Sequence, residues 1–343
     1  MTSERHIDGS QGEGGGQVLR TSLALSAITD TPVRVTRVRA GRSKSGLLRQ
    51  HLTALRAAAE ISGARVEGDE LGSQTLRFTP GRVRAGRYHF AVGTAGSACL
   101  VCQTVLPMLL MADGPSEVVF EGGTHAMGAP SFDFFARVFV PLLRRMGAEL
   151  EVTLERHGFY PAGGGRFVLR VQPVRAWTPL SLVEPAPLRV TGLTALVANL
   201  PFVVAQRELA HAGDALGVPA ELRRGMGVKS PGPGNVLMVE LASEHGTEQV
   251  TAFGRRGVSA EAVAQGAVVE TEALLRAGVS VGPHLADQLL LPMALAGGGA
   301  LRTTPLTLHS RTNLAVIQQF MPLSISDEAD GSGVTTLTLR GTA

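Results

Sequence analysis

Three stretches of the chain repeat one local pattern, an apolar helical run that ends in glycine and continues into a β-like run. They lie at 55–67, 141–152 and 272–281 of the 343 residues. Glycine at a helix C-terminus adopts the left-handed conformation that turns the chain back into a strand. A second phrase, L-P-M-L-L-M-A-D-G at 106–114, returns as L-P-M-A-L-A-G-G-G at 291–299. These patterns predict an α/β protein built from several units, each with helices packed on one sheet.

A proline-rich segment interrupts this pattern. Four prolines fall within 173–187, and the sequence after them has strand-like and helix-like runs of its own. The repeat-like pattern resumes beyond that block. We therefore expect a smaller α/β domain, 184–278, inserted into a larger domain made of 1–183 and 279–343.

The composition is that of a folded chain without a membrane span. Apolar residues make up 44% and charged residues 18%, which is not the composition of a disordered chain. The apolar runs stay below the roughly 18 residues that a transmembrane helix needs, and the N-terminus lacks the apolar core of a signal peptide. Two cysteines do not make a disulfide framework. We expect a cytoplasmic protein with no membrane partner.

Lysine and cysteine, which often carry covalent chemistry, are both scarce. Lys44 and Lys229 are the two lysines among 32 basic residues, and the others are arginines; the net charge is +3. A GC-rich genome or a warm habitat is the simplest explanation for this preference for arginine over lysine. Neither lysine lies in a P-loop, and neither begins the K-x-D-G run of a lysine-adenylating ligase. Cys99 and Cys102 form a C-x-x-C motif that invites a redox interpretation, but their apolar neighbours favour core packing. Covalent chemistry is therefore expected on another residue type.

Two N-terminal segments have features of phosphate-binding sites. Residues 8–22, D-G-S-Q-G-E-G-G-G-Q-V-L-R-T-S, form a glycine-rich loop that runs into a helix, whose first N–H groups can bind an anion. Glu13 in this loop could hold a metal ion, although a purely structural turn is the alternative. Residues 34–52 carry six positive charges, with Arg39 and Arg42 where a strand-like run enters a Gly/Ser loop. Such a run is either a solvated face or a site for phosphate or a nucleic-acid backbone.

The stretch from 284 to 313 holds the polar residues that most suggest catalysis. His284, Asp287 and Gln288 open an apolar helix, a glycine triplet ends it, and a short strand leads to His309. Two histidines and a carboxylate brought together could form a metal site or a hydrolase triad. The lysine scarcity, the arginine-rich segment and the glycine-rich loop make nucleotide phosphate the favoured substrate.

Other segments could contribute to such a site. Gln103 lies in an apolar helix that follows a glycine loop, and Pro130 precedes a cluster of phenylalanines. In a chain with 4% aromatic residues, that cluster either packs in the core or stacks on a base. His125 and His157 lack the spacing partners of a zinc site, and we expect both to be surface or core residues.

Together these motifs resemble the RNA 3′-terminal phosphate cyclase family, in its ATP-dependent catalytic branch, over essentially the whole chain. The resemblance rests on D-G-S-Q-G-E-G-G-G-Q-V-L-R, R-A-G-R, G-L-L-R-Q-H-L-T-A, E-L-G-S-Q, G-S-A, Q-T-V-L-P, R-H-G-F-Y-P-A-G-G-G and H-L-A-D-Q-L-L-L-P-M-A-L-A-G. The string R-H-G-F-Y-P-A-G-G-G at 156–165 is particularly specific. The family implies an α/β fold with a large domain of three repeats, each a β-sheet with two helices, and a smaller inserted α/β domain.

The resemblance implies an activity as well. ATP would adenylate a histidine, AMP would pass to the 3′-phosphate of an RNA, and the neighbouring 2′-hydroxyl would then close a 2′,3′-cyclic phosphate. The partner is therefore an RNA with a 3′-phosphate end, and no protein partner can be deduced.

Site residues follow from the resemblance by position. His309 would be the nucleophile, Asp287 would orient His309 or the metal, and Glu13 would bind a divalent cation, Mg²⁺ or Mn²⁺, on the ATP phosphates. His284 stands where the family often has tyrosine, and its imidazole could also stack on adenine. The other implied contacts are to phosphate oxygens, by Arg20, Arg39, Arg42 and Gln50, and to ATP, by Gln103, Leu285, Ala286, Asp287, Gln288, Pro130 and Phe134.

Two other classes share this type of fold. A ribosome-biogenesis branch of the family binds RNA without catalysis, but it lacks the nucleophile, whereas His309, Glu13 and Asp287 are all present here. Enolpyruvyl transferases need a cleft between two domains of several repeats each, and this chain is too short for that.

Overall fold

The computed structural model describes residues 3–342, and three of its four sheets repeat one topology. Each repeat runs strand, helix, strand, helix, strand, strand. In each sheet the four strands follow the order first, second, fourth, third; the first pair is parallel and the others are antiparallel. The predicted α/β fold with three sheet-and-two-helix repeats is confirmed.

The first repeat consists of β1 (Arg5–Asp8), α1 (Gly16–Ile28), β2 (Val33–Thr36), α2 (Arg49–Ser62), β3 (Arg65–Glu67) and β4 (Leu76–Thr79). The second consists of β5 (Arg87–Ala91), α3 (Ala98–Leu110), β6 (Ser116–Gly122), the run α4 (Phe132–Phe134), η1 (Phe135–Phe139) and α5 (Val140–Arg145), then β7 (Leu150–Arg156) and β8 (Gly165–Val171). The third consists of β9 (Leu180–Leu182), α8 (Pro283–Leu295), β14 (Gly298–Thr303), α9 (Leu308–Phe320), β15 (Leu323–Ala329) and β16 (Thr335–Gly341).

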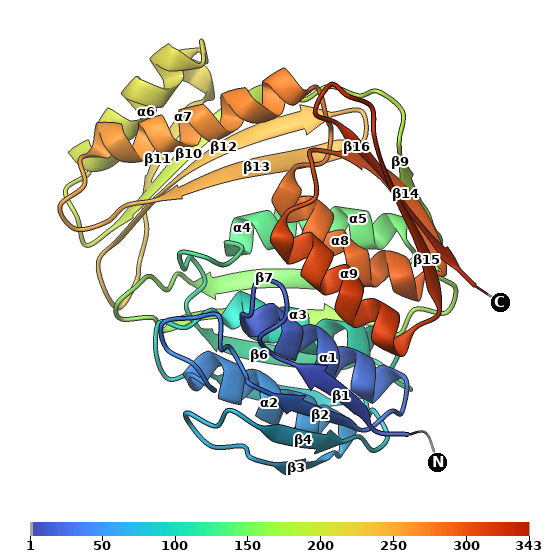
Figure 1. Ribbon diagram of the computed structural model, residues 1–343. Coiled ribbons are helices and arrows are strands. Elements are labelled where there is room, and N and C mark those ends of the chain that lie inside the picture. The colour runs from blue at the N-terminus through green and yellow to red at the C-terminus, as the bar shows by residue number, and fades with distance from the viewer. Residues whose placement is uncertain (1–2, 343) are drawn as a thin grey trace.

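The fourth sheet lies in a unit between β9 and α8 of the third repeat. Its strand order, β11-β10-β12-β13, differs from that of the repeats, and it packs around a separate apolar core. Figure 1 shows this unit above the first two repeats and beside the sheet of the third, with its two longer helices, α6 and α7, on the outer face of its own sheet. The elements of the inserted unit are β10 (Arg189–Ala198), α6 (Val203–Ala215), η2 (Ala220–Leu222), β11 (Arg223–Gly227), β12 (Gly234–Ser243), β13 (Gly246–Phe253) and α7 (Ala260–Ala277). The exact boundaries at 184 and 278 stay a prediction.

Glycine ends the helices in two of the three predicted places by the expected mechanism. Gly63 follows α2 with a φ of 61°, and Gly278 follows α7 with a φ of 65°. However, α7 belongs to the inserted unit, so the stretch 272–281 does not mark the third repeat. The L-P-M phrases mark equivalent helices instead, because they fall in the C-terminal halves of α3 and α8.

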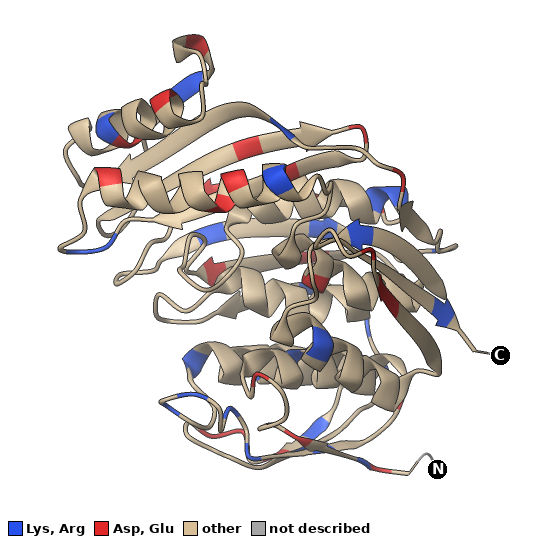
Figure 2. Ribbon diagram, turned by 45° about the horizontal axis from the view of Figure 1, so that its top comes forward, with Lys and Arg blue, Asp and Glu red and all other residues tan. Residues whose placement is uncertain are grey.

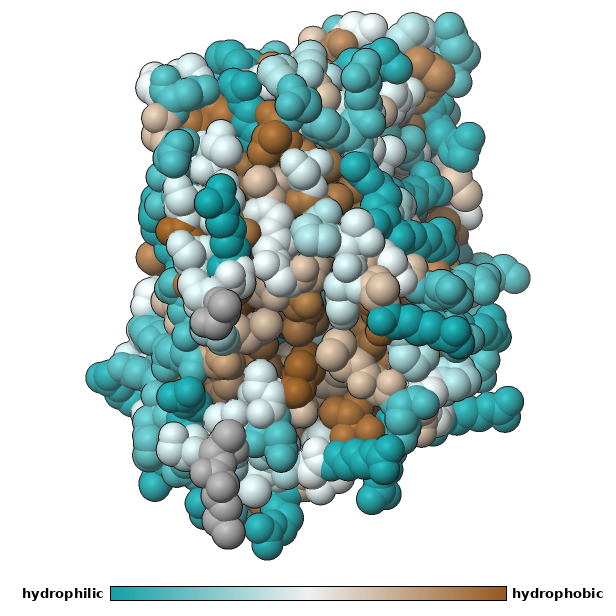
Figure 3. All heavy atoms as spheres, turned by 90° about the vertical axis from the view of Figure 1, so that its right-hand side faces the viewer, coloured by the Kyte–Doolittle hydropathy of each residue, from teal (hydrophilic) through white to brown (hydrophobic). Residues whose placement is uncertain are grey.

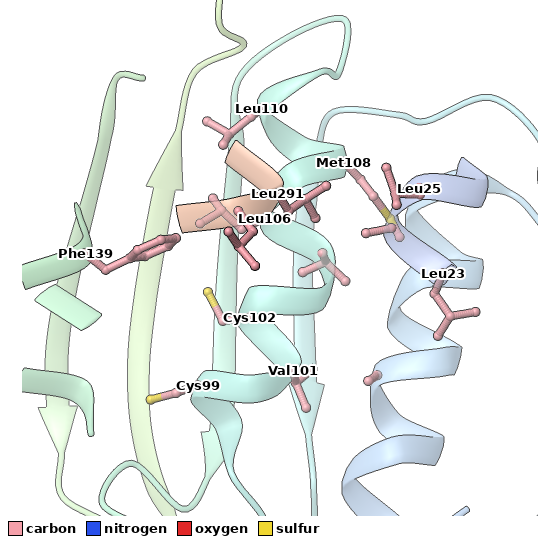
Figure 4. Close-up of a cluster of buried hydrophobic side chains, with 14 of the residues drawn as sticks. Leu23, Leu25, Cys99, Val101, Cys102, Leu106, Met108, Leu110, Phe139 and Leu291 are labelled. Carbon is pink, nitrogen blue, oxygen red and sulfur yellow. The ribbon is translucent and has the colours of Figure 1, made fainter. Parts of the chain in front are cut away.

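One apolar core runs through the three repeats. Figure 4 shows side chains of α1, α3, η1 and α8 that meet in it, with the sulfur atoms of Cys99 and Cys102 among them. Both thiols are free and fully buried, and burial raises the pKa of Cys99 to about 12. The expectation of core packing at this C-x-x-C therefore agrees with their positions.

Charged residues of both signs are interspersed along the repeats and the inserted unit (Figure 2). On the side that carries the third sheet, hydrophilic residues dominate the rim and apolar ones gather nearer the centre (Figure 3). No helix within residues 3–342 is long and apolar enough to cross a membrane.

Candidate active site

A cleft of about 740 Å³ lies between the helices of the repeats and the inserted unit. Helices α1, α8 and α9 begin at this cleft; Gln17 and His309 lie in the first turns of α1 and α9, and Asp287 is the fifth residue of α8. Backbone N–H groups at a helix start are unpaired and partly positive. The glycine before α1 provides no side-chain cap in the described chain, so these N–H groups remain available to an anion.

His309 belongs to a chain of partly buried polar contacts that joins α9, α1 and α8. Its Nδ1 lies 2.7 Å from Oε1 of Gln17. The amide nitrogen of Gln17 donates to both carboxylate oxygens of Asp287, at 2.9 and 2.8 Å. Asn313 donates to the Asp287 carbonyl at 3.2 Å and accepts from Thr21 Oγ1 at 2.8 Å. The side chain of His309 is nevertheless 49% exposed toward the cleft.

Glu13 lies on the other side of the His309 ring. Its Oε2 is 3.5 Å from His309 Nε2 and also accepts a hydrogen bond from Arg42. Its Oε1 is buried and has no hydrogen-bond partner among residues 3–342. An orphaned, buried carboxylate oxygen leaves a coordination position open for a cation.

The acidic groups at the cleft do not form a complete metal cage. Within the described part of the chain, no three His, Cys, Asp or Glu side chains are grouped closely enough to hold a metal ion. Mg²⁺ at nucleotide sites usually takes one or two protein carboxylates and fills its other positions with phosphate oxygens and water. The free Oε1 of Glu13 fits that mode of binding.

Arg20 lies beside these carboxylates. Burial lowers its pKa to about 10, while the charges of Asp287 and Glu13 oppose the shift. It therefore stays charged at neutral pH. Arg39 has a different environment, since it is 8% exposed and its Nη1 donates to the carbonyls of Lys44 and Gly46. The two hydrogen bonds from Nη1 of Arg39 thus hold the loop after β2 in place.

Gln50, at the start of α2, connects this loop to the second repeat, and His51 follows it in the same helix. Gln50 Oε1 accepts from the backbone N–H of Ser97, the N-cap of α3, at 2.9 Å. His51 is 4% exposed, and its Nδ1 accepts from Leu48 N at 3.3 Å. Burial and the charges of Arg20 and Arg39 lower its pKa to about 3.

The residues expected to contact ATP are divided between the cleft wall and the core. Gln103, Gln288, Pro130, Phe134 and His284 line the cleft. Gln103 donates to Gln288 across the gap between α3 and α8 at 2.5 Å. His284 is the most open of them, with 77% of its side chain exposed. Leu285 and Ala286 are instead each 1% exposed, so their side chains pack in the core.

Sequence reasoning missed Gln17, Thr21, His51 and Asn313. A signal was present, because Gln17 and Thr21 are four residues apart, as are His309 and Asn313. Residues four apart lie on one helix face, and these two polar faces pack together on α1 and α9. The sequence alone does not show that the two faces meet.

Comparisons with known proteins agree over nearly the whole chain. The family model described as RNA 3′-terminal phosphate cyclase matches residues 11–326. An "RNA 3′-terminal phosphate cyclase" of Koribacter versatilis is 52% identical over 335 residues, covering 97% of this chain and 94% of that protein. Proteins with the same name from Salmonella typhimurium and Ectopseudomonas mendocina are each 51% identical. The first match covers 95% of this chain and 96% of the relative, and the second covers 91% and 92%.

Proposed function

Because the chain belongs to the RNA 3′-terminal phosphate cyclase family, we propose that it uses ATP to convert RNA 3′-terminal phosphates to 2′,3′-cyclic phosphates in the cytoplasm. The observation that carries this proposal is the position of His309. Its ring is anchored at Nδ1 and exposed at the polar end of a cleft large enough for a nucleotide.

Three transfers make up the proposed reaction. Nε2 of His309 attacks the α-phosphorus of ATP, a P–N bond forms, and pyrophosphate leaves. An oxygen of the RNA 3′-phosphate then attacks the same phosphorus, the P–N bond breaks, and AMP is joined to the RNA through a pyrophosphate linkage. Finally the vicinal 2′-hydroxyl loses its proton, attacks the RNA phosphorus and expels AMP.

The chain's own residues would position the phosphates for these steps. Arg20 and Arg42 lie close to Glu13, the carboxylate beside His309, and guanidinium groups bind phosphate oxygens bidentately. Arg39 and Gln50 would act less directly, through the loop and the helix N-cap that they hold. A divalent cation held by Glu13 would neutralise developing charge on the ATP phosphates.

The nucleoside would lie between α3 and α8. Gln103 and Gln288 offer amide groups there, while Pro130, Phe134 and His284 offer faces on which a base can stack. Asp287 would contact the nucleotide site through Gln17. The alternative, an RNA-binding paralogue without catalysis, is not favoured because His309, Glu13 and Asp287 meet at one cleft.

A cyclisation assay tests this proposal. An RNA with a 3′-phosphate is incubated with the protein, ATP and Mg²⁺, and the product is tested for resistance to phosphatase. We expect conversion by the wild type and none by His309→Ala. A matched control is His245→Ala, because His245 is bonded to the carbonyl of Glu184, outside the cleft, and should retain activity. Wild-type protein that leaves the 3′-phosphate unchanged, or His309→Ala that still converts it, would contradict the assignment.

A further inference from the structure

Gln17 is the side chain that joins His309 to Asp287. It is 8% exposed, so neither of its polar ends is free to turn to bulk water. Its Nε2 lies 2.9 and 2.8 Å from the two carboxylate oxygens of Asp287, and its Oε1 lies 2.7 Å from Nδ1 of His309. The amide is thus held at both ends.

The carboxylate fixes the direction in which this amide points. A carboxylate oxygen only accepts hydrogen bonds, so the NH₂ group of Gln17 must face Asp287, and Oε1 must face His309. Oε1 has no proton to donate. The proton in the 2.7 Å contact therefore belongs to Nδ1 of His309, and the neutral ring has its lone pair on Nε2.

We propose that Gln17 is a positioning residue that holds His309 in the Nδ1–H tautomer and so makes Nε2 the attacking atom. This inference rests on the proposed function. An amide oxygen is too weak a base to take the Nδ1 proton, so the ring keeps that proton after the P–N bond forms. When AMP passes to the RNA, the bonding electrons return to Nε2 and the ring leaves as neutral imidazole.

The surroundings of the His309 ring explain why its tautomer has to be fixed. Nε2 of His309 is 3.5 Å from Oε2 of Glu13, and a carboxylate favours a proton on the nitrogen that faces it. Without an acceptor at Nδ1, the proton would move to Nε2 and occupy the nucleophilic lone pair. Asn313 and Thr21 support the arrangement, because they fix Asp287 and, through it, the Gln17 amide.

Two substitutions at position 17 separate the hydrogen bond from the packing. Gln17→Leu keeps the approximate shape but removes the acceptor, whereas Gln17→Glu keeps an acceptor for Nδ1. The single-turnover rate of protein adenylation is measured with α-labelled ATP and Mg²⁺. The His309 tautomer is measured by ¹⁵N NMR of histidine-labelled protein, with the signal assigned by its loss in His309→Ala. Gln319→Leu is a matched control on α9, where the exposed Gln319 amide donates to the Ala315 carbonyl one turn earlier.

We expect Gln17→Leu to lose about 10- to 100-fold in rate, as removal of supporting partners typically does, and to show the Nε2–H tautomer. Gln17→Glu should keep Nδ1–H, with a rate between those of Gln17→Leu and wild type because its second oxygen faces the Asp287 carboxylate, and Gln319→Leu should match wild type. Wild-type rate with Nδ1–H in Gln17→Leu would overturn the inference, as would equal losses in both Gln17 variants with an unchanged tautomer. A wild type that shows Nδ1–H but no adenylation would instead contradict the proposed function.

Discussion

At the scale of single residues, burial decides which groups at the cleft carry charge. It lowers the pKa of Arg20 only to about 10, so the guanidinium remains positive at neutral pH. It lowers the pKa of His51 from 6.5 to about 3, helped by the charges of Arg20 and Arg39. The arginines thus supply the positive charge near this end of the cleft, and His51 is a buried, neutral ring within reach of their charges.

This assignment predicts that His51 does not titrate near neutral pH. Its ring resonances should keep their neutral-form shifts from pH 7 down to pH 5. The unfolded chain takes up the proton near pH 6.5 while the folded protein does not, so stability should fall as the pH drops from about 6.5 toward about 3. Relative to His51→Gln, wild type should lose up to about 1.4 kcal/mol per pH unit in that window. A His51 midpoint near 6.5 would contradict the burial argument.

At the scale of elements, the loop between β7 and β8 connects the inserted unit to the repeats. Gly163 and Gly164 in this loop have φ angles of 66° and 68°. A Cβ on Gly163 would lie 2.5 Å from the Thr94 carbonyl oxygen, and one on Gly164 would lie 2.8 Å from Pro231 of the inserted unit. The glycines of R-H-G-F-Y-P-A-G-G-G therefore allow the loop to lie close to the Thr94 backbone and to the Pro231 ring.

Alanine substitutions test that contact. Gly217 provides a matched control, because its φ is 65° and no described atom lies within 4 Å of a Cβ there. Gly217→Ala should cost about 1–2 kcal/mol from the left-handed backbone alone. Gly163→Ala should cost about 1–3 kcal/mol more, because the added methyl meets a backbone oxygen. Equal free energies of unfolding for the two variants, measured with denaturant, would show that the close approach carries no cost.

Helices and strands were also the features that the sequence predicted best. The C-terminal glycines of α2 and α7 and the paired L-P-M phrases predicted an α/β repeat fold, because local chemistry controls helix ends. The same reasoning wrongly grouped 272–281 with the repeats, because α7 of the inserted unit ends by the same local mechanism. A glycine at a helix end predicts that the chain turns there, but it does not indicate which sheet the following strand joins.

At the scale of the whole molecule, the inserted unit closes one side of the cleft and is tied to the repeats by a few contacts. Phe159 is 2% exposed and packs in a small core with Leu196, Ala198, Val236 and Met238 of the inserted sheet. Glu248 on β13 accepts from the backbone N–H of Gly282, just before α8, at 2.8 Å. Burial raises the pKa of Glu248 to about 7.

Removing the Phe159 ring should loosen this attachment. Phe159→Ala should cost about 3–5 kcal/mol, as aromatic truncation in a core does, and amide exchange should quicken in β10 and β12 more than in α1. Phe202→Ala serves as a control in the same unit, because Phe202 is 45% exposed, and it should change exchange little. Unaltered exchange of β10 and β12 in Phe159→Ala would show that this cluster does not hold the unit in place.

Contacts between residues that are far apart in the sequence could not be predicted from the sequence. The residue types of the cleft could be named, but Gln17 and His309 are 292 positions apart, and nothing local indicates that α1 and α9 pack side by side. The family resemblance implied contacts of Leu285 and Ala286 with ATP; their side chains pack in the core, and those contacts stay a prediction.

The most direct test of the central claim is to locate AMP on the protein. Wild-type protein is incubated with α-labelled ATP and Mg²⁺, digested under alkaline conditions that preserve a phosphoramidate, and analysed by mass spectrometry. We expect an acid-labile, base-stable AMP adduct on the peptide that contains His309, and its absence in His309→Ala. AMP on Lys44, on Lys229 or on another histidine, or no adduct on the wild type, would contradict this claim.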